Sequence, residues 1–284
     1  MIAADLDSRS GVTVGFDFVV PQNHSAYSAK DHEVWRTLYA RQKDLLRGRA
    51  VDEFFDGLET LGVGAEGIPD FRDLNRTLLA ATGWSVVAVP GLVPDDVFFT
   101  HLAERRFPAG YWIRSPDQLD YIEEPDVFHD IFGHAPLLML PRYARYMEAY
   151  GKAGREAAGT GRLRRLARLY WYTIEFGLMR TPAGLRIFGA GLASSGGEEA
   201  YCLDSPAPNR ILFDCERAMR TTYEIDAFQK TYFVLEGWNA LPRLDSEELR
   251  ARFQRVERLP DLASSETLAS DILVGRYGAL KERR

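Results

Sequence analysis

The sequence predicts a mainly α-helical fold of the α+β class, in which a single helical domain carries a small β element. Apolar residues recur at helical spacing along most of the chain. Runs of β-branched residues are few, short and scattered, so a doubly wound parallel sheet is not expected. With 284 residues, the chain is long enough to bury a substantial core.

The N-terminal elements are predicted from their end signals and apolar spacing. Residues 1–27 lack helical periodicity and are expected to form an extended arm. Ser28 and Asp31 then make a capping box that starts a helix, and two further helices end at Gly62 and Gly83. The apolar faces of these three helices are Val34, Trp35, Leu38, Tyr39, Leu45 and Leu46; Val51, Phe54, Phe55, Leu58 and Leu61; and Phe71, Leu74 and Leu78.

The rest of the chain alternates between predicted helices and short strands. The predicted strands are Val86–Val89, Tyr111–Ile113, Arg186–Phe188 and Tyr232–Leu235. The predicted helices are Asp95–Arg106, a helix from Pro125 to about Gly133, Leu163–Leu178, and a helix from Ser246 that leads to a frayed end. No repeat or linker divides residues 1–284, so one domain is expected, with about 1–15 and 260–284 peripheral or flexible.

Composition and charge exclude several classes of function. The net charge is −6, and the basic stretches Arg162–Arg168 and Arg250–Arg258 are interleaved with apolar residues, as on solvated helix faces. Binding to nucleic acid is therefore not expected. The two cysteines, Cys202 and Cys215, are expected to be reduced and buried. No signal peptide or membrane span is predicted, and the expected location is the cytoplasm.

Two of the five histidines indicate a metal site. His129 and His134 lie in the segment EPDVFHDIFGHAPLL, among carboxylates and apolar residues. Imidazole nitrogens suit a mid-series divalent metal. The spacing of five residues separates side chains by about 140° on an ideal α-helix, so we expect a break at Gly133 to bring the two histidines together. The alternative is that both are ordinary core or surface histidines.

Glu175 is the best candidate for a third ligand. It lies in the apolar and aromatic segment LYWYTIEFG, where an unpaired carboxylate is costly to bury. Trp171 is four residues earlier and would share its helix face, beside an aromatic substrate. Two histidines and one carboxylate form the ligand set of non-haem iron(II) oxygenases. Two alternatives remain open at this point: an ion pair between Glu175 and an arginine, and a zinc-dependent hydrolase that uses the same triad.

Five segments resemble the pterin-dependent aromatic amino acid hydroxylases, most closely the short bacterial phenylalanine 4-monooxygenases. In order, these segments are EPDVFHDIFGHAPLL, LARLYWYTIEFGL, TPAGLRIFGAGLASS, YCLDSPAPNR and FQKTYFV. The resemblance extends over about residues 16–240. It implies the fold of that family without a regulatory or tetramerisation domain, and hence a monomer that binds small molecules.

The resemblance also implies roles for residues at matching positions. His129, His134 and Glu175 match the iron ligands. Arg114 matches the arginine that holds the substrate carboxylate, and Asp126 matches the acid that orients this arginine. The other matches on the substrate side are Pro125, Trp171, Ser194, Ser195 and Ile225, and those on the cofactor side are Gly91, Leu92, Phe98, Asp130 and Tyr170.

Some of these matches carry a specific expectation. Pro125 and Trp171 should wall the substrate ring, Phe98 should stack on the pterin, and Ser194 should hydrogen-bond a ligand histidine. Ile225 stands where enzymes that prefer tyrosine have an acidic residue, which favours phenylalanine. The implied reaction converts L-phenylalanine, O2 and a tetrahydropterin into L-tyrosine and a hydroxypterin, with Fe(II) as cofactor. Hydroxylation of tryptophan, or at the meta position of phenylalanine, are the alternatives within the family.

Overall fold

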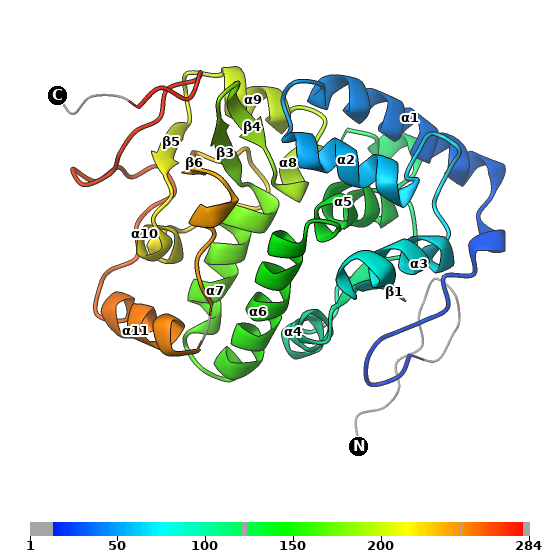
Figure 1. The fold of residues 1–284 in the computed structure, drawn as a ribbon, viewed down its shortest axis with the longest axis horizontal. Helices are drawn as coiled ribbons and strands as arrows, with labels where there is room; N and C mark the ends of the chain where they lie inside the picture. The colour runs from blue at the N-terminus through cyan, green and yellow to red at the C-terminus, as the bar shows by residue number, and fades with distance from the viewer. Residues whose placement is uncertain (1–13, 121–123, 245, 281–284) are drawn as a thin grey trace. The chain divides into compact units, whose positions relative to one another are not determined.

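Helices hold far more residues than strands do, and the strands are short, which confirms the predicted α+β class (Figure 1). The computed structural model describes residues 14–120, 124–244 and 246–280. Contacts group the chain into two units, Met1–Asp44 with Glu53–Arg155 and Leu45–Asp52 with Glu156–Arg284. The single domain expected from the sequence stays a prediction.

The first unit is helical, with one pair of parallel strands. Its strands β1 and β2 pair from Ser85↔Arg106 to Val89↔Gly110. Helix α3 packs on β1 and α4 packs on β2. The bounds are α1 Ala29–Leu46, α2 Asp52–Leu61, α3 Phe71–Thr82, β1 Ser85–Val89, α4 Asp95–Ala103, β2 Arg106–Gly110, a π-helical segment His129–His134, α5 Ala135–Leu138 and α6 Pro141–Ala157, with short 3-10 turns at His24–Ala26 and Pro116–Gln118.

The predicted end signals of the first helices are confirmed. The amide of Ser28 donates to the Asp31 carboxylate at 2.8 Å, and the amide of Asp31 donates to the Ser28 hydroxyl at 3.2 Å. Gly62 and Gly83 follow α2 and α3 with φ of 68° and 74°, a left-handed conformation that suits glycine at the end of a helix.

The predictions between residues 95 and 113 need correction. Helix α4 ends at Ala103 and not at Arg106, and the strand is Arg106–Gly110 and not Tyr111–Ile113. The backbone turns at Arg105, whose φ is +57°, and the Arg105 carbonyl accepts the Ser85 amide at 3.0 Å. Pairing with β1 therefore sets the strand, which periodicity alone could not indicate.

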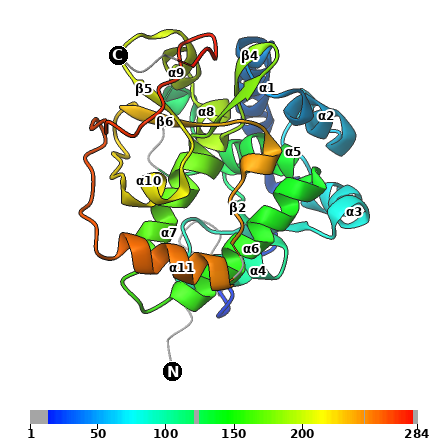
Figure 2. The ribbon, with the colours of Figure 1, turned by 60° about the vertical axis from the view of Figure 1, so that its left-hand side comes forward.

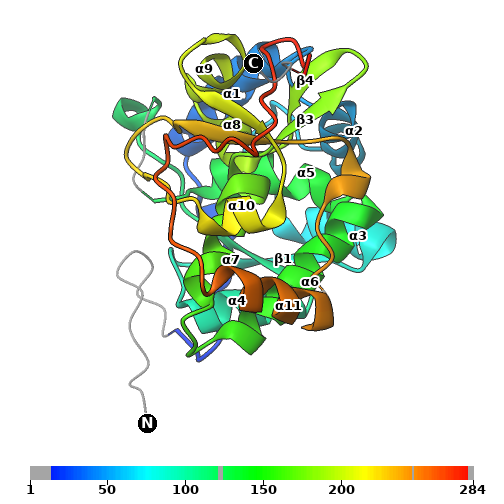
Figure 3. The same cartoon turned by 90° about the vertical axis from the view of Figure 1, so that its left-hand side faces the viewer.

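The second unit contains a mixed sheet and several short helices. Its strand order is β4-β3-β6-β5, antiparallel between β4 and β3 and otherwise parallel. Helix α10 contacts both α7 and α11, as Figures 2 and 3 show. The bounds are α7 Leu163–Tyr170, a π-helical segment Trp171–Glu175, β3 Leu178–Thr181, β4 Gly184–Ile187, α8 Ala190–Ser194, α9 Glu198–Asp204, β5 Asn209–Leu212, α10 Cys215–Arg220, β6 Thr231–Leu235, a 3-10 turn Trp238–Ala240 and α11 Ser246–Val256.

Three predictions in this unit were incomplete or wrong. The helix predicted over Leu163–Leu178 ends at Glu175, because Leu178 begins a strand that pairs with β4 and β6. The strand predicted over Arg186–Phe188 starts earlier, at Gly184. The tail is packed rather than frayed over its described part, since Leu262 and Val274 are 4% and 2% exposed. The sequence prediction also missed β3, β5, α8, α9 and α10 in this unit and α6 in the first unit.

Two expectations about chemistry and location are tested by the fold. Cys202 and Cys215 are free and buried, as predicted. Within the described residues, no helix combines the length and the apolar character needed to cross a membrane.

Candidate metal and substrate site

The two histidines meet because the helix that carries them is a π-helix. Nε2 of His134 lies 3.3 Å from Nε2 of His129, and the ring planes stand at 83°. A π-helix bonds each residue to the fifth one along the chain, so residues five apart lie one turn above each other. Gly133 does not end the helix, which continues through Ala135–Leu138. The predicted break at Gly133 is therefore wrong, although the predicted convergence of the two histidines is confirmed.

Aromatic packing fixes this helix in the first unit. Phe128 and Phe132 stack on each other at 4.8 Å between ring centroids, and both are fully buried. Phe128 contacts Trp35 of α1 edge to face, and Phe132 contacts Phe54 of α2 in the same way. Such contacts add about 0.5–1.5 kcal/mol each beyond the burial of area. The helix is thereby held from both sides, which limits how far the histidines can turn.

Glu175 ends a second π-helical segment. The amide of Phe176 donates to the carbonyl of Trp171, five residues earlier, at 2.9 Å. Two glycines let helix α8 approach this turn closely. A Cβ at Gly189 would lie 2.4 Å from the Glu175 carbonyl oxygen, and one at Gly191 would lie 3.3 Å from its carboxylate Oε2. The backbone that presents Glu175 is thus enclosed on one side by residues that have no side chain.

The ligand atoms of His129, His134 and Glu175 all lie within 4.8 Å of one another, the one such group found among the described residues. The donor set of two imidazoles and one carboxylate is that of non-haem iron(II) sites. Two nitrogens bound to one metal at about 2.1 Å, with an angle of about 90–109° between the bonds, lie about 3.0–3.4 Å apart. The observed 3.3 Å between the histidine nitrogens fits this geometry. The residues present therefore suit a divalent iron.

Arg114 and Asp126 form a buried ion pair in the first unit. The Arg114 side chain donates from Nε and Nη2 to the two carboxylate oxygens at 2.8 and 2.9 Å. Arg114 is 5% exposed and Asp126 0%, so both charges of the pair are buried. Asp126 also accepts the backbone amide of His129 at 3.0 Å. One carboxylate thus orients the arginine and supports a candidate metal ligand.

Trp171 is held by a network of hydrogen bonds that was not predicted from the sequence. Its indole Nε1 donates to Gln229 at 2.9 Å, and its ring stacks on Tyr223 at 4.2 Å. The backbone amide of Gln229 donates to buried Glu198 at 2.8 Å, and Glu198 also accepts the Tyr232 hydroxyl at 2.6 Å. Burial raises the pKa of Glu198, although these two hydrogen bonds oppose the rise. The only signal in the sequence was a glutamine inside the family segment FQKTYFV.

The remaining predicted substrate residues lie in several places. Ser194 is buried and donates to the Ala190 carbonyl at 2.9 Å, and the Ser195 hydroxyl accepts the Glu198 amide at 3.2 Å. Ile225 is 75% exposed. The expected roles of Ser194, Ser195 and Ile225 stay predictions.

The predicted cofactor residues of the first unit surround β1, β2 and α4. Gly91 and Leu92 follow β1, and Leu92 is 72% exposed. Phe98 is half-buried on α4, which is not the environment of an ordinary core residue. Asp130 is 7% exposed, and its carboxylate accepts the Gly110 amide at 2.7 Å.

Pro125 and Tyr170 complete the set of predicted residues. Both are half-buried. The carbonyl of Pro125 lies 3.3 Å from where a Cβ at Gly110 would stand, so Pro125 and Asp130 flank the same glycine. Tyr170 ends α7, directly before the π-helical segment that carries Glu175.

Comparison with known proteins identifies the family to which the chain belongs. The family model of the biopterin-dependent aromatic amino acid hydroxylases matches residues 11–258. The chain belongs to this family and has its fold, which confirms the resemblance drawn from the sequence. Membership of a hydroxylase family sets aside the alternative of a zinc-dependent hydrolase.

The relatives point further, to one activity within the family. The chain is 56% identical to the phenylalanine-4-hydroxylase of Ralstonia nicotianae, over 94% of this chain and 86% of that protein. It is 52% identical to a solved phenylalanine hydroxylase of Chromobacterium violaceum that holds iron(III) and 7,8-dihydrobiopterin, with a TM-score of 0.90 over 96% of this chain and all of that one. A further structure of that enzyme contains iron and phenylalanine, at 51% identity and a TM-score of 0.89 over 95% of this chain and all of that one.

Proposed function

We propose that this enzyme hydroxylates L-phenylalanine to L-tyrosine with Fe(II), a tetrahydropterin and O2. One oxygen atom of O2 goes to the ring, and the other goes to the pterin, which leaves as a hydroxypterin. The observation that carries the proposal is the group of His129, His134 and Glu175 in a chain about half identical to solved phenylalanine hydroxylases.

His129, His134 and Glu175 would hold the iron, which supplies the activation of O2 that protein side chains lack. Both histidine nitrogens face one point, and Glu175 offers a carboxylate from a turn that α8 encloses. Three protein ligands leave coordination positions open for reactants. The task of the chain is therefore to hold the ligands in place while reactants enter beside them.

Arg114 would bind the carboxylate of the amino acid. A guanidinium has five N–H donors, and the Asp126 carboxylate occupies only one on Nε and one on Nη2. The remaining three, two on Nη1 and one on Nη2, form an edge that suits a second carboxylate. The buried pair fixes this edge before the substrate arrives, which lowers the entropic cost of binding.

Two aromatic residues and a proline would place the two ring systems. Trp171 and Pro125 would wall the substrate ring, and Phe98 would stack on the pterin. Gly91, Leu92, Asp130 and Tyr170 would lie around the pterin; Ser194, Ser195 and Ile225 would lie around the ligands and the substrate. The hydrogen bond from Trp171 to Gln229 fixes the rotation of the indole, which supports a role in shaping the pocket.

Location and assembly are part of the proposal. The two free, buried cysteines support a reducing compartment such as the cytoplasm. We propose that the enzyme acts as a monomer and binds small molecules rather than nucleic acid, and light scattering after size-exclusion chromatography would test the oligomeric state.

Product analysis tests the proposed reaction. The iron-loaded enzyme should convert L-phenylalanine to L-tyrosine only when O2 and a tetrahydropterin are both present. Chromatography separates tyrosine from the meta isomer and from hydroxytryptophan, so assays with phenylalanine and with tryptophan separate the alternatives. His129→Ala, His134→Ala and Glu175→Ala should each lose iron and activity while they keep the far-ultraviolet circular dichroism of the parent. Full iron content in any one of them would remove that residue from the ligand set.

A further inference from the structure

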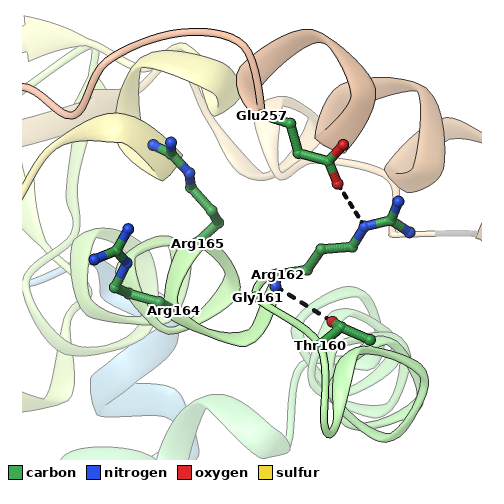
Figure 4. A pocket seen from close by; sticks show the side chains of 6 residues that line it. All are labelled: Thr160, Gly161, Arg162, Arg164, Arg165 and Glu257. Atoms are coloured by element: carbon green, nitrogen blue, oxygen red, sulfur yellow. Dashed lines mark hydrogen bonds and ion pairs between the residues drawn. The ribbon is translucent and has the colours of Figure 1, made fainter.

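The second unit has a cavity that the hydroxylation reaction does not use. Its volume is about 630 Å³, within the range of about 300–1,000 Å³ that is typical of small-molecule sites. Figure 4 shows the six residues that line it. They are Thr160, Gly161, Arg162, Arg164, Arg165 and Glu257. None of these residues is a candidate ligand of iron or a candidate contact of phenylalanine or pterin.

Positive charge exceeds negative charge around this cavity. Arg162 pairs with Glu257 at 2.8 Å, which balances both. The other two arginines of the lining share a single carboxylate, that of Asp261, with the buried Arg168, which does not line the cavity. Arg165 and Arg168 reach it at 2.7 Å each, and Arg164 only at 3.5 Å. Three guanidinium groups against one carboxylate leave an excess of two positive charges, and an anion in the cavity would reduce it.

The electrostatics of Arg165 reflect this excess. Its side chain is 10% exposed, whereas that of Arg164 is 70% exposed. Burial lowers the pKa of Arg165, and the charges of Arg168, Arg164 and Arg220 lower it further against the opposing effect of Asp261. A cation with positive neighbours that its acid does not balance is stabilised by a nearby anion.

The backbone at the mouth of the cavity is also suited to an anion. Helix α7 begins at Leu163 and runs without a break into the π-helical segment that ends at Glu175. The amino end of such a helix carries a partial positive charge. A Cβ added at Gly161 would meet nothing within 4 Å, so the chain here faces open space. Figure 4 shows Arg162 extending toward Glu257, while Arg164 and Arg165 extend in a different direction from α7.

We propose that this arginine cavity is a second ligand site, and that it binds a phosphate group. Guanidinium forks match the oxygens of phosphate, and Arg164 has the weakest internal pairing and the greatest freedom to turn toward a ligand. The volume exceeds that of one phosphate ion, so the site has room for a small phosphorylated molecule as well. The proposal does not depend on which amino acid the enzyme hydroxylates.

Calorimetric titration of inorganic phosphate into the iron-loaded enzyme, at an ionic strength held constant with potassium chloride, tests the proposal. We expect saturable binding to one site. Arg164→Gln should raise the dissociation constant for phosphate by about tenfold or more, because a hydrogen bond between two charged groups is lost. Arg164→Lys should give an intermediate value, since it keeps the charge and loses the fork.

The matched control is Arg76→Gln. Arg76 is 76% exposed and pairs with one carboxylate, that of Asp73, at 2.7 Å, so its setting resembles that of Arg164. This variant should bind phosphate as the parent does. Absence of saturable binding, or equal binding by the parent and the Arg164→Gln variant, overturns the proposal; the second result would show that phosphate binds at a site other than this cavity. Titration with glycerol 3-phosphate separates the sources: tighter binding than inorganic phosphate indicates a phosphorylated metabolite, and weaker binding indicates the free ion.

Discussion

Asp126 shows how a single buried residue can link two functions. It receives hydrogen bonds from the side chain and backbone of Arg114 and from the backbone of His129. Removal of one partner from a buried ion pair costs about 3–5 kcal/mol, because the other charge stays buried. The carboxylate therefore ties the residue expected to bind substrate to a residue expected to bind iron.

Arg114→Lys should weaken substrate binding although it conserves charge. A lysine cannot pair with both oxygens of Asp126 and still offer a flat edge to a second carboxylate. We expect a loss of about 1.5–3 kcal/mol, the range for hydrogen bonds to charged groups, and hence a KM for phenylalanine raised about tenfold or more. Steady-state kinetics with phenylalanine and pterin varied in turn measure the effect. A KM for phenylalanine equal to that of the parent would show that Arg114 does not bind the substrate carboxylate.

Gln229→Leu should disturb the pocket through Trp171 without touching substrate. The indole N–H would lose its acceptor, at a cost of about 1–3 kcal/mol if it stays buried, and the ring would be free to rotate on Tyr223. We expect a higher KM for phenylalanine and less tyrosine formed per pterin oxidised, with little change in the KM for pterin.

Gln229→Glu is the comparison for this prediction, since it keeps an acceptor for the indole, although it loses the two hydrogen bonds that Gln229 Nε2 donates to the carbonyls of Glu224 and Ala227. It should restore most of the ratio of tyrosine to oxidised pterin. If both variants lowered this ratio equally, the acceptor that Gln229 offers to the Trp171 indole would have no part in the effect.

The two helical elements that carry the candidate ligands share a local geometry. His129–His134 and Trp171–Glu175 are both π-helical, and each lies in line with α-helical turns. The residue types and apolar spacing of these segments fit an α-helix equally well, so the sequence predicted helices and gave no indication of the wider turn. The convergence of the histidines was predicted correctly, but the reason given, a break at Gly133, was wrong. Tertiary packing sets the geometry of the turn, and the sequence pattern does not show that packing.

Gly189→Ala should loosen the iron site through the backbone. The added methyl group would lie 2.4 Å from the Glu175 carbonyl and 2.5 Å from the Gly177 amide, so α8 or the turn must move. Overpacking of this kind costs about 1–3 kcal/mol. We expect a lower melting temperature and reduced iron content, measured by thermal unfolding and by metal analysis after gel filtration.

Gly161→Ala is the matched control, because a Cβ at that position meets nothing within 4 Å. It should retain the iron content of the parent. If Gly189→Ala kept full iron content with a melting temperature like that of the control, the contact between α8 and Glu175 would have no part in holding the ligand.

For the molecule as a whole, the sequence predicted chemistry better than architecture. Rare residues in an unusual setting, such as Glu175 in an apolar segment, stand out without any structure. Strand pairing depends on residues far apart, and β2 and β5 are formed by segments whose own pattern is weak. Arg114 and Gln229 acquire their partners through contacts 12 and 58 residues away, which spacing cannot show.

Acid should destabilise the second unit through Asp261. Its hydrogen bond with Arg168 holds its pKa at about 2, below the ordinary value of 3.8. A carboxyl group whose pKa is lowered by folding stabilises the fold above its unfolded pKa, and this contribution is lost as the pH falls from about 4 to 2. This contribution to the unfolding free energy is at most about 2 kcal/mol, because solvent screens a carboxylate that is 30% exposed.

Urea unfolding of the parent and of Asp261→Asn at pH 7, 4 and 2 measures this contribution. The difference in unfolding free energy between the two proteins should be large at pH 7 and should shrink toward pH 2. A difference independent of pH would show that the carboxylate charge is not what stabilises this region.

The wider turns of the two ligand-bearing helices restrict where residues can be inserted into or deleted from proteins of this family. Loss or gain of one residue within His129–His134 or Trp171–Glu175 would turn everything beyond it by about a quarter of a turn around the helix axis. The first such event would separate the histidines, and the second would turn Glu175 away from its present direction. Substitutions in these two segments can be absorbed one side chain at a time, whereas insertions and deletions cannot. Alignments of working relatives should therefore be free of gaps here and should collect them in the connecting loops.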